Sequence, residues 1–365
     1  MTTNKGLWIL LLLFQTFTLF GQDYKDYTSL KKALNKKDKV YFLHLDNKEI
    51  ESIPPDIANL KNVTYCYLSF NKLKELPNEI GALSKLKRFT VHYNQLNSLP
   101  ESIGNLTELE WFQADENNLI EVPNGIGNLT KLTHLTLGGN RLQRVPPTIG
   151  GLVNLQFFEL RANDLTELPQ EIGLLVSLNF LSLDSNKIDI LPKTIGDLQK
   201  LRTLNIKNNK IVKLPQEISE LNNLTHLTVD GNRLTTFQGI VLPNGLQWLT
   251  ATNNDIREID NSITNLNSLT HIDLSDNRIT SIPNGISKMK ELKNLVLRSN
   301  EIRQLPSDLF DMEKLETIDI KNNQISEIPY SIKNLKKLKY LGLNGNPIND
   351  IESIRKLLPE TTVDF

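Results

Sequence analysis

Residues 132–142 read LTHLTLGGNRL, and this stretch decides the fold. Apolar and polar residues alternate around Leu135, which predicts a short strand with one face turned inward. A second frame, LPxxIGxL, follows the strand frame, as in LPQEIGLL at 168–175. Its proline and glycine end the strand and predict that the chain turns back through a short helical or irregular segment.

The strand frame recurs along the chain with an asparagine at a nearly fixed interval. Every gap is 23 residues except the gap between Asn232 and Asn254, which is 22. An earlier frame around Lys48 lacks the asparagine, so the sequence predicts fourteen units and a solenoid. The recurring asparagines are Asn71, Asn94, Asn117, Asn140, Asn163, Asn186, Asn209, Asn232, Asn254, Asn277, Asn300, Asn323 and Asn346.

The two frames together resemble the leucine-rich repeat family. The match is to the 23-residue type LPxxIGxLxxLxxLxLxxNxL, which Ras-signalling scaffold, plant intracellular and bacterial members share. The resemblance covers residues 40–348. It implies an α/β solenoid: a leucine-rich repeat horseshoe with a parallel β-sheet on the concave face and short helical or irregular segments on the convex face.

The recurring asparagines stand in an otherwise apolar column. A buried side-chain amide is tolerated only when its donors and its acceptor are hydrogen-bonded. We therefore expect each asparagine to bond the backbone of adjacent coils, so that the set forms a structural asparagine ladder.

The coils of a solenoid contact mainly their neighbours, so both ends need a cover. Residues 27–34 predict a short amphipathic helix, and the apolar residues after Asn346 suit a closing helix that ends at Pro359. The expected organisation is a signal peptide at 1–21, an N-terminal helical cap at 22–39, fourteen leucine-rich repeats at 40–348 and a C-terminal helical cap at 349–365.

The N-terminus resembles a secretory signal peptide. Lys5 precedes an apolar run that resumes through Phe20, and Gly21 leads into polar residues, which places the expected cut after Gly21. The run is shorter than the roughly 20 apolar residues that span a bilayer. A retained anchor is the alternative interpretation, and the membrane would then be contacted only through this uncleaved segment.

Cysteine usage bears on the compartment. The only cysteine, Cys66, stands at an inward strand position, where it suits the core as a small apolar residue. The ends lack the cysteine clusters common in animal extracellular leucine-rich repeat proteins. We therefore expect a secreted or periplasmic protein of a Gram-negative bacterium.

Charge and motifs argue against several classes of function. The chain has 41 basic and 42 acidic side chains without a basic stripe, which disfavours a nucleic-acid partner. The glycines at 125 and 127 suit a return turn, and no catalytic constellation emerges. The histidines stand at outward strand positions two or more coils apart, about 10 Å or more, which disfavours a metal site. We expect no enzyme, no cofactor, no metal and no small-molecule substrate. The histidines are His44, His92, His134, His226 and His271.

Outward strand positions carry the candidate binding residues, and they are aromatic in the N-terminal half. Exposed rings at this density suit a partner-binding patch, because they bury much area at low conformational cost. The other interpretation is that the rings simply pack against each other from strand to strand. The candidates are Phe42, Tyr65, Tyr67, Phe70, Tyr93, Trp111, His134, Phe157, Phe180 and Trp248.

The repeat is irregular once, between Asn232 and Asn254. The stretch LPNGLQWL at 242–249 is similar to the shorter repeats of secreted bacterial leucine-rich effectors, and Asp260 replaces the proline of the next coil. We expect a local change of curvature here, which is either a functional joint or a neutral deletion.

Three functions remain open at this stage. The first is a secreted or envelope-facing scaffold whose concave strand face binds a protein partner. The second is a structural or adhesive surface component that self-assembles. The third is an intracellular signalling scaffold, which the repeat type permits and the apolar N-terminal segment opposes.

Overall fold

Each coil of the chain forms one three-residue strand and one return segment. We describe the fold from a computed structural model, which describes residues 26–365. The expected signal peptide at 1–21 lies outside the described residues, as does the beginning of the expected N-terminal cap, 22–25.

The strands form one parallel sheet in chain order, with 16 strands in the described part of the chain. Strand β1 (Asp26–Tyr27) and strand β16 (Thr362–Asp364) extend the sheet of the repeats at its two ends. The repeat strands are β2 (Phe42–His44), β3 (Tyr65–Tyr67), β4 (Arg88–Thr90), β5 (Trp111–Gln113), β6 (His134–Thr136), β7 (Phe157–Glu159), β8 (Phe180–Ser182), β9 (Thr203–Asn205), β10 (His226–Thr228), β11 (Trp248–Thr250), β12 (His271–Asp273), β13 (Asn294–Val296), β14 (Thr317–Asp319) and β15 (Tyr340–Gly342).

The return segments are short 3-10 helices that begin after the proline of LPxxIG. Pro169 has extended backbone angles, and the helix after it ends where Leu175 donates to the carbonyl of Ile172 at 3.2 Å. A side chain on Gly173 would meet the Thr194 carbonyl at 2.6 Å, which explains the glycine. The helices are η3 (Pro55–Asn59), η4 (Asn78–Ala82), η5 (Glu101–Asn105), η6 (Asn124–Asn128), η7 (Pro147–Gly151), η8 (Gln170–Leu174), η9 (Lys193–Asp197), η10 (Gln216–Glu220), η11 (Asn261–Asn265), η12 (Ile286–Lys288), η13 (Ser307–Asp311) and η14 (Tyr330–Asn334).

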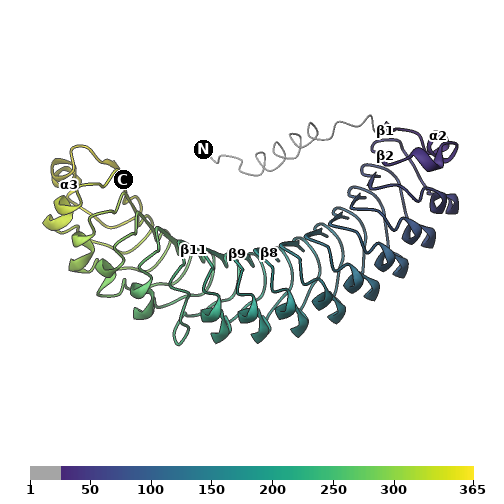
Figure 1. Cartoon of the computed structure of the whole chain (residues 1–365). Coiled ribbons are helices and arrows are strands. Elements are labelled where there is room, and N and C mark those ends of the chain that lie inside the picture. The colour runs from purple at the N-terminus through teal and green to yellow at the C-terminus, as the bar shows by residue number, and fades with distance from the viewer. Residues whose placement is uncertain (1–25) are drawn as a thin grey trace.

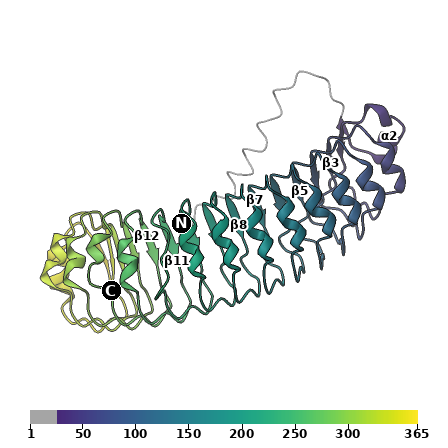
Figure 2. The ribbon, with the colours of Figure 1, turned by 60° about the horizontal axis from the view of Figure 1, so that its bottom comes forward.

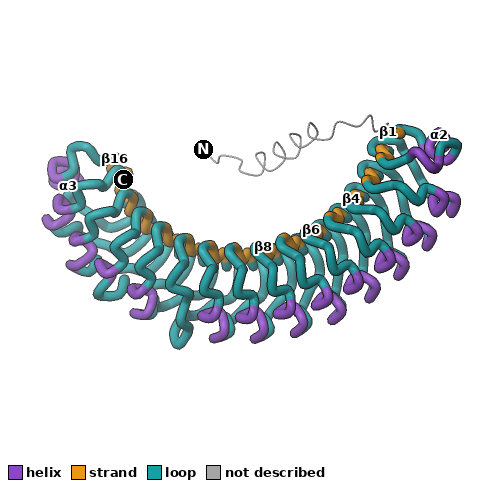
Figure 3. The backbone as a smooth tube through the Cα atoms, in the orientation of Figure 1, coloured by secondary structure: helices purple, strands orange, loops and turns teal. Residues whose placement is uncertain are grey.

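The stacked coils curve into an open horseshoe. The sheet lines the inner side of the arc and the helices lie on the outer side, as Figure 1 and the colours of Figure 3 show. Figure 2 shows the return helices side by side along the solenoid. Neighbouring strands on the inner side lie about 4.8 Å apart, whereas the helices on the outer side are wider than this spacing. The outer side is therefore longer than the inner side, and the solenoid curves. The predicted fold class is confirmed.

The core is one continuous apolar column between the sheet and the return helices. The middle residue of each strand points into it, and Phe89 and Phe112 stack there with centroids 5.5 Å apart. Cys66 is a free, buried residue of this column, and burial raises the pKa of its thiol. A buried thiol with a raised pKa is unreactive.

The asparagines bond the backbone across coil boundaries, as Asn163 illustrates. Its Nδ2 donates to the carbonyls of Leu137 and Leu160, each at 3.0 Å, and its Oδ1 accepts from the amide of Leu142 at 2.9 Å. The other recurring asparagines accept in the same way from the preceding coil. Each amide therefore joins two coils.

The residue before each ladder asparagine has a left-handed backbone. Its φ ranges from +50° at Ala162 to +78° at Gly345. Glycine, asparagine and aspartate tolerate this conformation best among the residue types present. Phe70 and Tyr93 also adopt it, with φ of +56° and +52°.

The N-terminal end is covered by a helix shorter than predicted. Helix α2 spans Leu30–Leu34 and buries Ala33, followed by the 3-10 helix η2 (Lys37–Lys39). The predicted helix begins at Tyr27, but Tyr27 instead pairs with Leu43 in strand β1. Pairing with the first repeat strand satisfies its backbone.

The C-terminal end has a helix followed by a strand. Helix α3 (Ile351–Leu357) begins after Asp350, whose carboxylate accepts from the amide of Ser353 at 3.1 Å. The chain then returns to the sheet as β16, which the sequence analysis did not predict. Asp364 of this strand is bonded by Lys321 at 2.5 Å and by the Tyr340 hydroxyl at 3.1 Å.

The irregular coil changes its return segment and keeps its ladder. Gly239 has φ +72°, and Phe237 and Ile240 fill the core where other coils place helix residues. Asn254 still accepts from the amide of Leu234 at 2.9 Å. In the next coil, Asp260 replaces the proline as cap of η11 and accepts from the amide of Ser262 at 2.7 Å.

Replacing a ladder asparagine should destabilise the solenoid strongly. Asn163→Ala leaves the Leu142 amide without its partner and removes one of the two ladder donors from each of the carbonyls of Leu137 and Leu160. Because three hydrogen bonds are lost, we expect a loss of about 2–4 kcal/mol in the free energy of unfolding, measured by urea titration. Asn154→Ala is the matched control, because Asn154 is exposed and donates to one carbonyl, that of Thr130. A loss below about 1 kcal/mol for Asn163→Ala would contradict the role of the ladder.

Candidate functional site

The predicted aromatic column lies on the concave face in a single register. The first residue of each repeat strand pairs with the first residue of the next, as Phe42 does with Tyr65 and Trp111 with His134. The following residue in each strand points into the core, so the first residue points outward. The inner side of the horseshoe therefore carries the column.

The rings of the column stack along the sheet between β5 and β8. The centroids of Trp111 and His134 are 3.9 Å apart, those of His134 and Phe157 are 5.9 Å apart, and those of Phe157 and Phe180 are 4.3 Å apart. The guanidinium of Arg88 lies 4.8 Å from the centre of the Trp111 ring and extends the stack toward the N-terminus. We call these five side chains the concave stack.

A second group of rings lies at the N-terminal end of the same face. Phe42 and Tyr65 stack with their planes 2° apart and centroids 4.8 Å apart. Beside them, Tyr67 lies 5.3 Å from the ring of His44. All four belong to strands β2 and β3.

The rings of the concave stack are half-buried by one another and keep part of their surface exposed. Packing from strand to strand and accessibility to a partner therefore coexist in this column. Trp248 is more open, with 39% of its surface exposed. It stands apart in β11, stacked 3.6 Å from the ring of His271.

Burial favours the neutral form of three concave-face histidines. Burial, and to a smaller extent the nearby Arg88 charge, together lower the pKa of His134 to about 4. Burial also lowers the pKa of His92 and of His271. At neutral pH the ring of His134 therefore acts as one more uncharged aromatic surface.

Carboxylates flank the concave stack at β5 to β7. Asp115 accepts from the hydroxyl of Thr136 and from the amide of Gly138 at 2.8 Å, and Glu159 accepts from Nε of Arg161 at 2.6 Å. Burial raises the pKa of both carboxyls, and in Glu159 the neighbouring charge of Asp115 raises it further. This side of the stack therefore has a negative potential that Arg161 only partly offsets.

Phe70 and Tyr93 lie where the chain leaves the sheet, at the rim of the concave face. Their rings stack at 4.8 Å with planes 8° apart, and 47% and 50% of their surfaces are exposed. The left-handed backbone costs about 1–2 kcal/mol per residue, whereas an aromatic pair returns about 0.5–1.5 kcal/mol. We call this couple the rim pair, and stacking alone does not offset its strain.

The C-terminal part of the concave face is polar. Asn294 and Thr317 continue the column there, and the carboxylate of Asp319, fully buried, accepts from Nε of Arg298 at 2.7 Å. Lys321 lies over the ring of Tyr340, 5.6 Å from its centre. Lys321 also bonds Asp364 of the closing strand β16, and apart from Trp248 the aromatic candidates belong to the N-terminal half.

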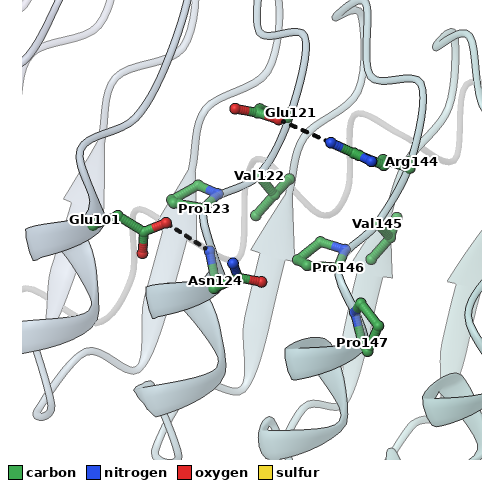
Figure 4. Close-up of a pocket in the computed structure, with 9 residues that line it drawn as sticks. All are labelled: Glu101, Glu121, Val122, Pro123, Asn124, Arg144, Val145, Pro146 and Pro147. Carbon is green, nitrogen blue, oxygen red and sulfur yellow. Dashed lines mark hydrogen bonds and ion pairs between the residues drawn. The ribbon is translucent and has the colours of Figure 1, made fainter.

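A shallow groove outside the concave face crosses three consecutive coils, those of η5, η6 and η7, as Figure 4 shows. Its charged groups are already paired: Glu121 lies 3.6 Å from Arg144, and Glu101 accepts from the amides of Asn124 and Gly125. It is lined by Glu101, Glu121, Val122, Pro123, Asn124, Arg144, Val145, Pro146 and Pro147. It offers no set of free polar groups that converge on a ligand.

Residues 26–365 carry neither a metal-binding cluster nor a membrane-spanning helix. Within that range the histidines, cysteine and carboxylates form no group of three that could hold a metal ion. No helix in the same range has the length and apolar character needed to cross a membrane.

The sequence analysis missed three features of the site. It did not place Arg88 over Trp111, nor the network of Asp115, Glu159 and Arg161. It also missed the left-handed backbone at Phe70. The sequence does contain a sign of the left-handed backbone, because glycine, asparagine, aspartate or serine precedes the ladder asparagine in most coils.

The lowered pKa of His134 predicts a pH-dependent stability. Between pH about 6.5 and about 4 the unfolded chain binds a proton at His134 that the folded chain does not. The folded protein therefore loses stability as the pH falls through that window. We expect the urea midpoint of the parent to fall more steeply there than that of His134→Phe. Parallel curves for the two proteins would contradict the burial of this ring.

Comparisons with known proteins agree with this architecture. A model described as a leucine-rich repeat region matches residues 170–251, and one described as a leucine rich repeat matches residues 130–188, 244–302 and 290–348. A search among curated proteins gave no significant match.

Solved structures similar to the chain share its solenoid fold. A leucine-rich repeat protein of Leptospira interrogans is 31% identical, with 93% of this chain and 100% of that chain covered and a TM-score of 0.76. The plant peptide hormone receptor RGFR1, in complex with RGF2, is 29% identical over 85% of this chain and 56% of that chain, with a TM-score of 0.68. The functional domain of InlJ from Listeria monocytogenes, 21% identical over 90% of this chain and 72% of that chain, shares the fold with a TM-score of 0.68.

The matched segments together run from residue 130 to residue 348, more than half of the chain, and the Leptospira protein is matched over its whole length. The repeat, the parallel sheet and the asparagine ladder are those that the family's pattern implies. The chain belongs to the leucine-rich repeat family.

Proposed function

We propose that the chain is a secreted or envelope-facing scaffold that binds a protein partner through its concave strand face. The observation that supports this most is the concave stack, in which half-exposed rings follow one another on four consecutive strands, β5 to β8. Large rings of this kind dominate protein interfaces, because they bury much area and have few torsions to fix.

The family relationship supports the same class of function. Leucine-rich repeat proteins are typically interaction scaffolds without enzymatic activity, and we propose no catalytic role. One similar structure is a peptide hormone receptor in complex with RGF2. This chain spans 56% of that receptor, so its ligand supports a protein or peptide partner only by analogy.

The proposed location rests on the N-terminal sequence. The apolar run that ends before Gly21, together with Lys5, resembles a secretory signal, and the lack of cysteine clusters favours a bacterial envelope. A concave face with this exposure would then meet partners in the periplasm, on the cell surface or in the medium.

Exposed side chains on the convex side favour a second candidate, a surface component that self-assembles. Val153, Leu174 and Val176 lie in consecutive coils at or just after η7 and η8, and 43%, 55% and 52% of their surfaces are exposed. A contact between copies would cover them. Assembly of the pure protein into large species in a sizing run at increasing concentration would favour this candidate over the scaffold.

Truncating the aromatic face should abolish partner capture. We expect protein from Gln22 onward to retain a partner from the host's envelope and medium, and a variant with Tyr65→Ala, Tyr67→Ala, Trp111→Ala and Phe157→Ala to lose it. Central aromatic residues of an interface each contribute about 2 kcal/mol or more, so the affinity for the captured partner should fall at least about 100-fold in calorimetry.

A matched control separates this face from the convex side. The variant Val153→Ala, Leu174→Ala and Val176→Ala removes a similar apolar surface from the outside of the arc, and we expect it to capture the partner as the parent does. Equal capture by the folded aromatic variant and the parent would contradict a concave site. Loss in the convex variant alone would place the contact on the outside.

The secretory proposal predicts the mature N-terminus. Mass spectrometry of protein isolated from the host should give a chain that begins at Gln22, found in the periplasm, at the cell surface or in the medium. An intact N-terminus in protein from the cytoplasm would contradict secretion and favour the intracellular signalling scaffold.

A further inference from the structure

The rim pair occupies a backbone conformation that its residue types disfavour. Phe70 and Tyr93 directly precede the ladder residues Asn71 and Asn94 and have φ of +56° and +52°. A bulky side chain in this region is an outlier, and such outliers are retained mainly where a function requires them.

The equivalent position in the other coils carries smaller or polar residues. None of these is aromatic, and most are types that adopt the left-handed region readily. They are Asn47, Glu116, Gly139, Ala162, Ser185, Asn208, Gly231, Asn253, Asp276, Ser299, Asn322 and Gly345.

The rim pair is held firmly although it is exposed. His92 lies edge-on to both rings, with its centroid 5.2 Å from that of Phe70 and 5.8 Å from that of Tyr93. The hydroxyl of Ser69 lies 3.0 Å from Nδ1 of His92 and fixes the imidazole. The two stacked rings therefore form a preorganised aromatic surface supported from beneath.

Carboxylates lie one coil away on each side of the rim pair. On the N-terminal side, Asp46 accepts from the amide of Ser69 at 2.6 Å. On the C-terminal side, the amide of Tyr93 donates to the carbonyl of Asp115 at 3.0 Å, and Glu116 follows Asp115. The side chains of Asp46 and Glu116 are 26% and 34% exposed and belong to the coils next to the rim pair, and the carboxylate of Asp46 also lies 3.2 Å from Nε2 of His44.

Two of the nearby positive charges are paired with carboxylates. Lys72 lies 3.7 Å from Glu49, and Arg161 bonds Glu159 at 2.6 Å while it lies 3.4 Å from Glu116. The ring faces and the flanking carboxylates together attract a cation, because a cation is favoured over an aromatic face and by opposite charge.

We propose that the rim pair is a clamp for the arginine or lysine side chains of a basic segment in a protein partner. The inference rests on the proposed function and adds the chemistry of the partner's contact surface. Arginine suits the clamp best, because its planar guanidinium stacks on rings and bonds carboxylates at its edge. The chain contains an internal example in Arg88, whose guanidinium lies 4.8 Å from the centre of the Trp111 ring.

The first experiment measures stability, because strained side chains that are retained for binding should lower the free energy of unfolding. We expect Phe70→Asn with Tyr93→Asn to raise the urea midpoint, because asparagine adopts the left-handed backbone with less strain. Ala162→Asn, at the same position of another coil, is the control and should raise it slightly. A fall in the midpoint of the double variant would show that the rings support the fold, and would overturn the inference.

The second experiment measures the chemistry of the ligand with defined peptides. The probe is a glycine-spaced heptapeptide with three arginines, compared by ligand-observed NMR with the same peptide carrying glutamate or leucine. We expect the arginine peptide to bind the parent protein most tightly of the three. In the variant with Phe70→Asn and Tyr93→Asn, we expect the Kd of that peptide to rise at least about fivefold. Equal binding of the leucine peptide, or of the arginine peptide to the double variant, would overturn the clamp.

A comparison with the concave stack separates this inference from the proposed function. Partner capture that survives Phe70→Asn with Tyr93→Asn but is lost in Trp111→Ala with Phe157→Ala would refute the clamp and leave the concave scaffold intact. Capture that survives both would refute the scaffold proposal itself. Loss in both, with the arginine preference in the peptides, supports the two together.

Discussion

The structure depends on the hydrogen bonding of one buried amide per coil. An asparagine in an apolar column is tolerable only when its donors and its acceptor are all engaged, and its partners are backbone groups of its own coil and the preceding one. Asn163 finds them at 2.9–3.0 Å in Leu142, Leu137 and Leu160. Neighbouring coils must therefore keep the same path near the asparagine. The shortened coil before Asn254 keeps this path, because it lacks one residue in its return segment on the convex side and not near the asparagine.

The ladder also sets the geometry of the surface that faces partners. Since every asparagine occupies the same place, the strands before it stay in register, and outward residues such as Trp111 and His134 meet face to face. The same turn forces a left-handed backbone on the preceding residue, which defines a rim along the sheet. Where that residue is Phe70 or Tyr93, the scaffold carries strain at an exposed position. Strain of this kind is common where function competes with stability.

Aromatic and acidic groups are combined on one half of the concave face. The neutral ring of His134 keeps the stack uncharged from Trp111 to Phe180, while Asp115 and Glu159 give its border a negative potential. The other end uses its charges internally, as the bonds of Lys321 and Tyr340 to Asp364 show. The two halves of the face therefore present different chemistry on an otherwise uniform scaffold.

The repeat pattern of the sequence determined the fold, the strand positions and the placement of Trp111, Phe157 and Phe180 in one outward column, because a fixed period transfers the geometry of one coil to all others. It could not determine the ends, where no repeat applies: Tyr27 pairs as a strand, and Thr362–Asp364 adds the last strand. Only the tertiary structure decided which rings touch, that Arg161 bonds Glu159, and that the exposed residues Phe70 and Tyr93 lie at a strained turn. These features arise from contacts between neighbouring coils and from the backbone angles that stacking imposes, and local sequence does not encode either alone.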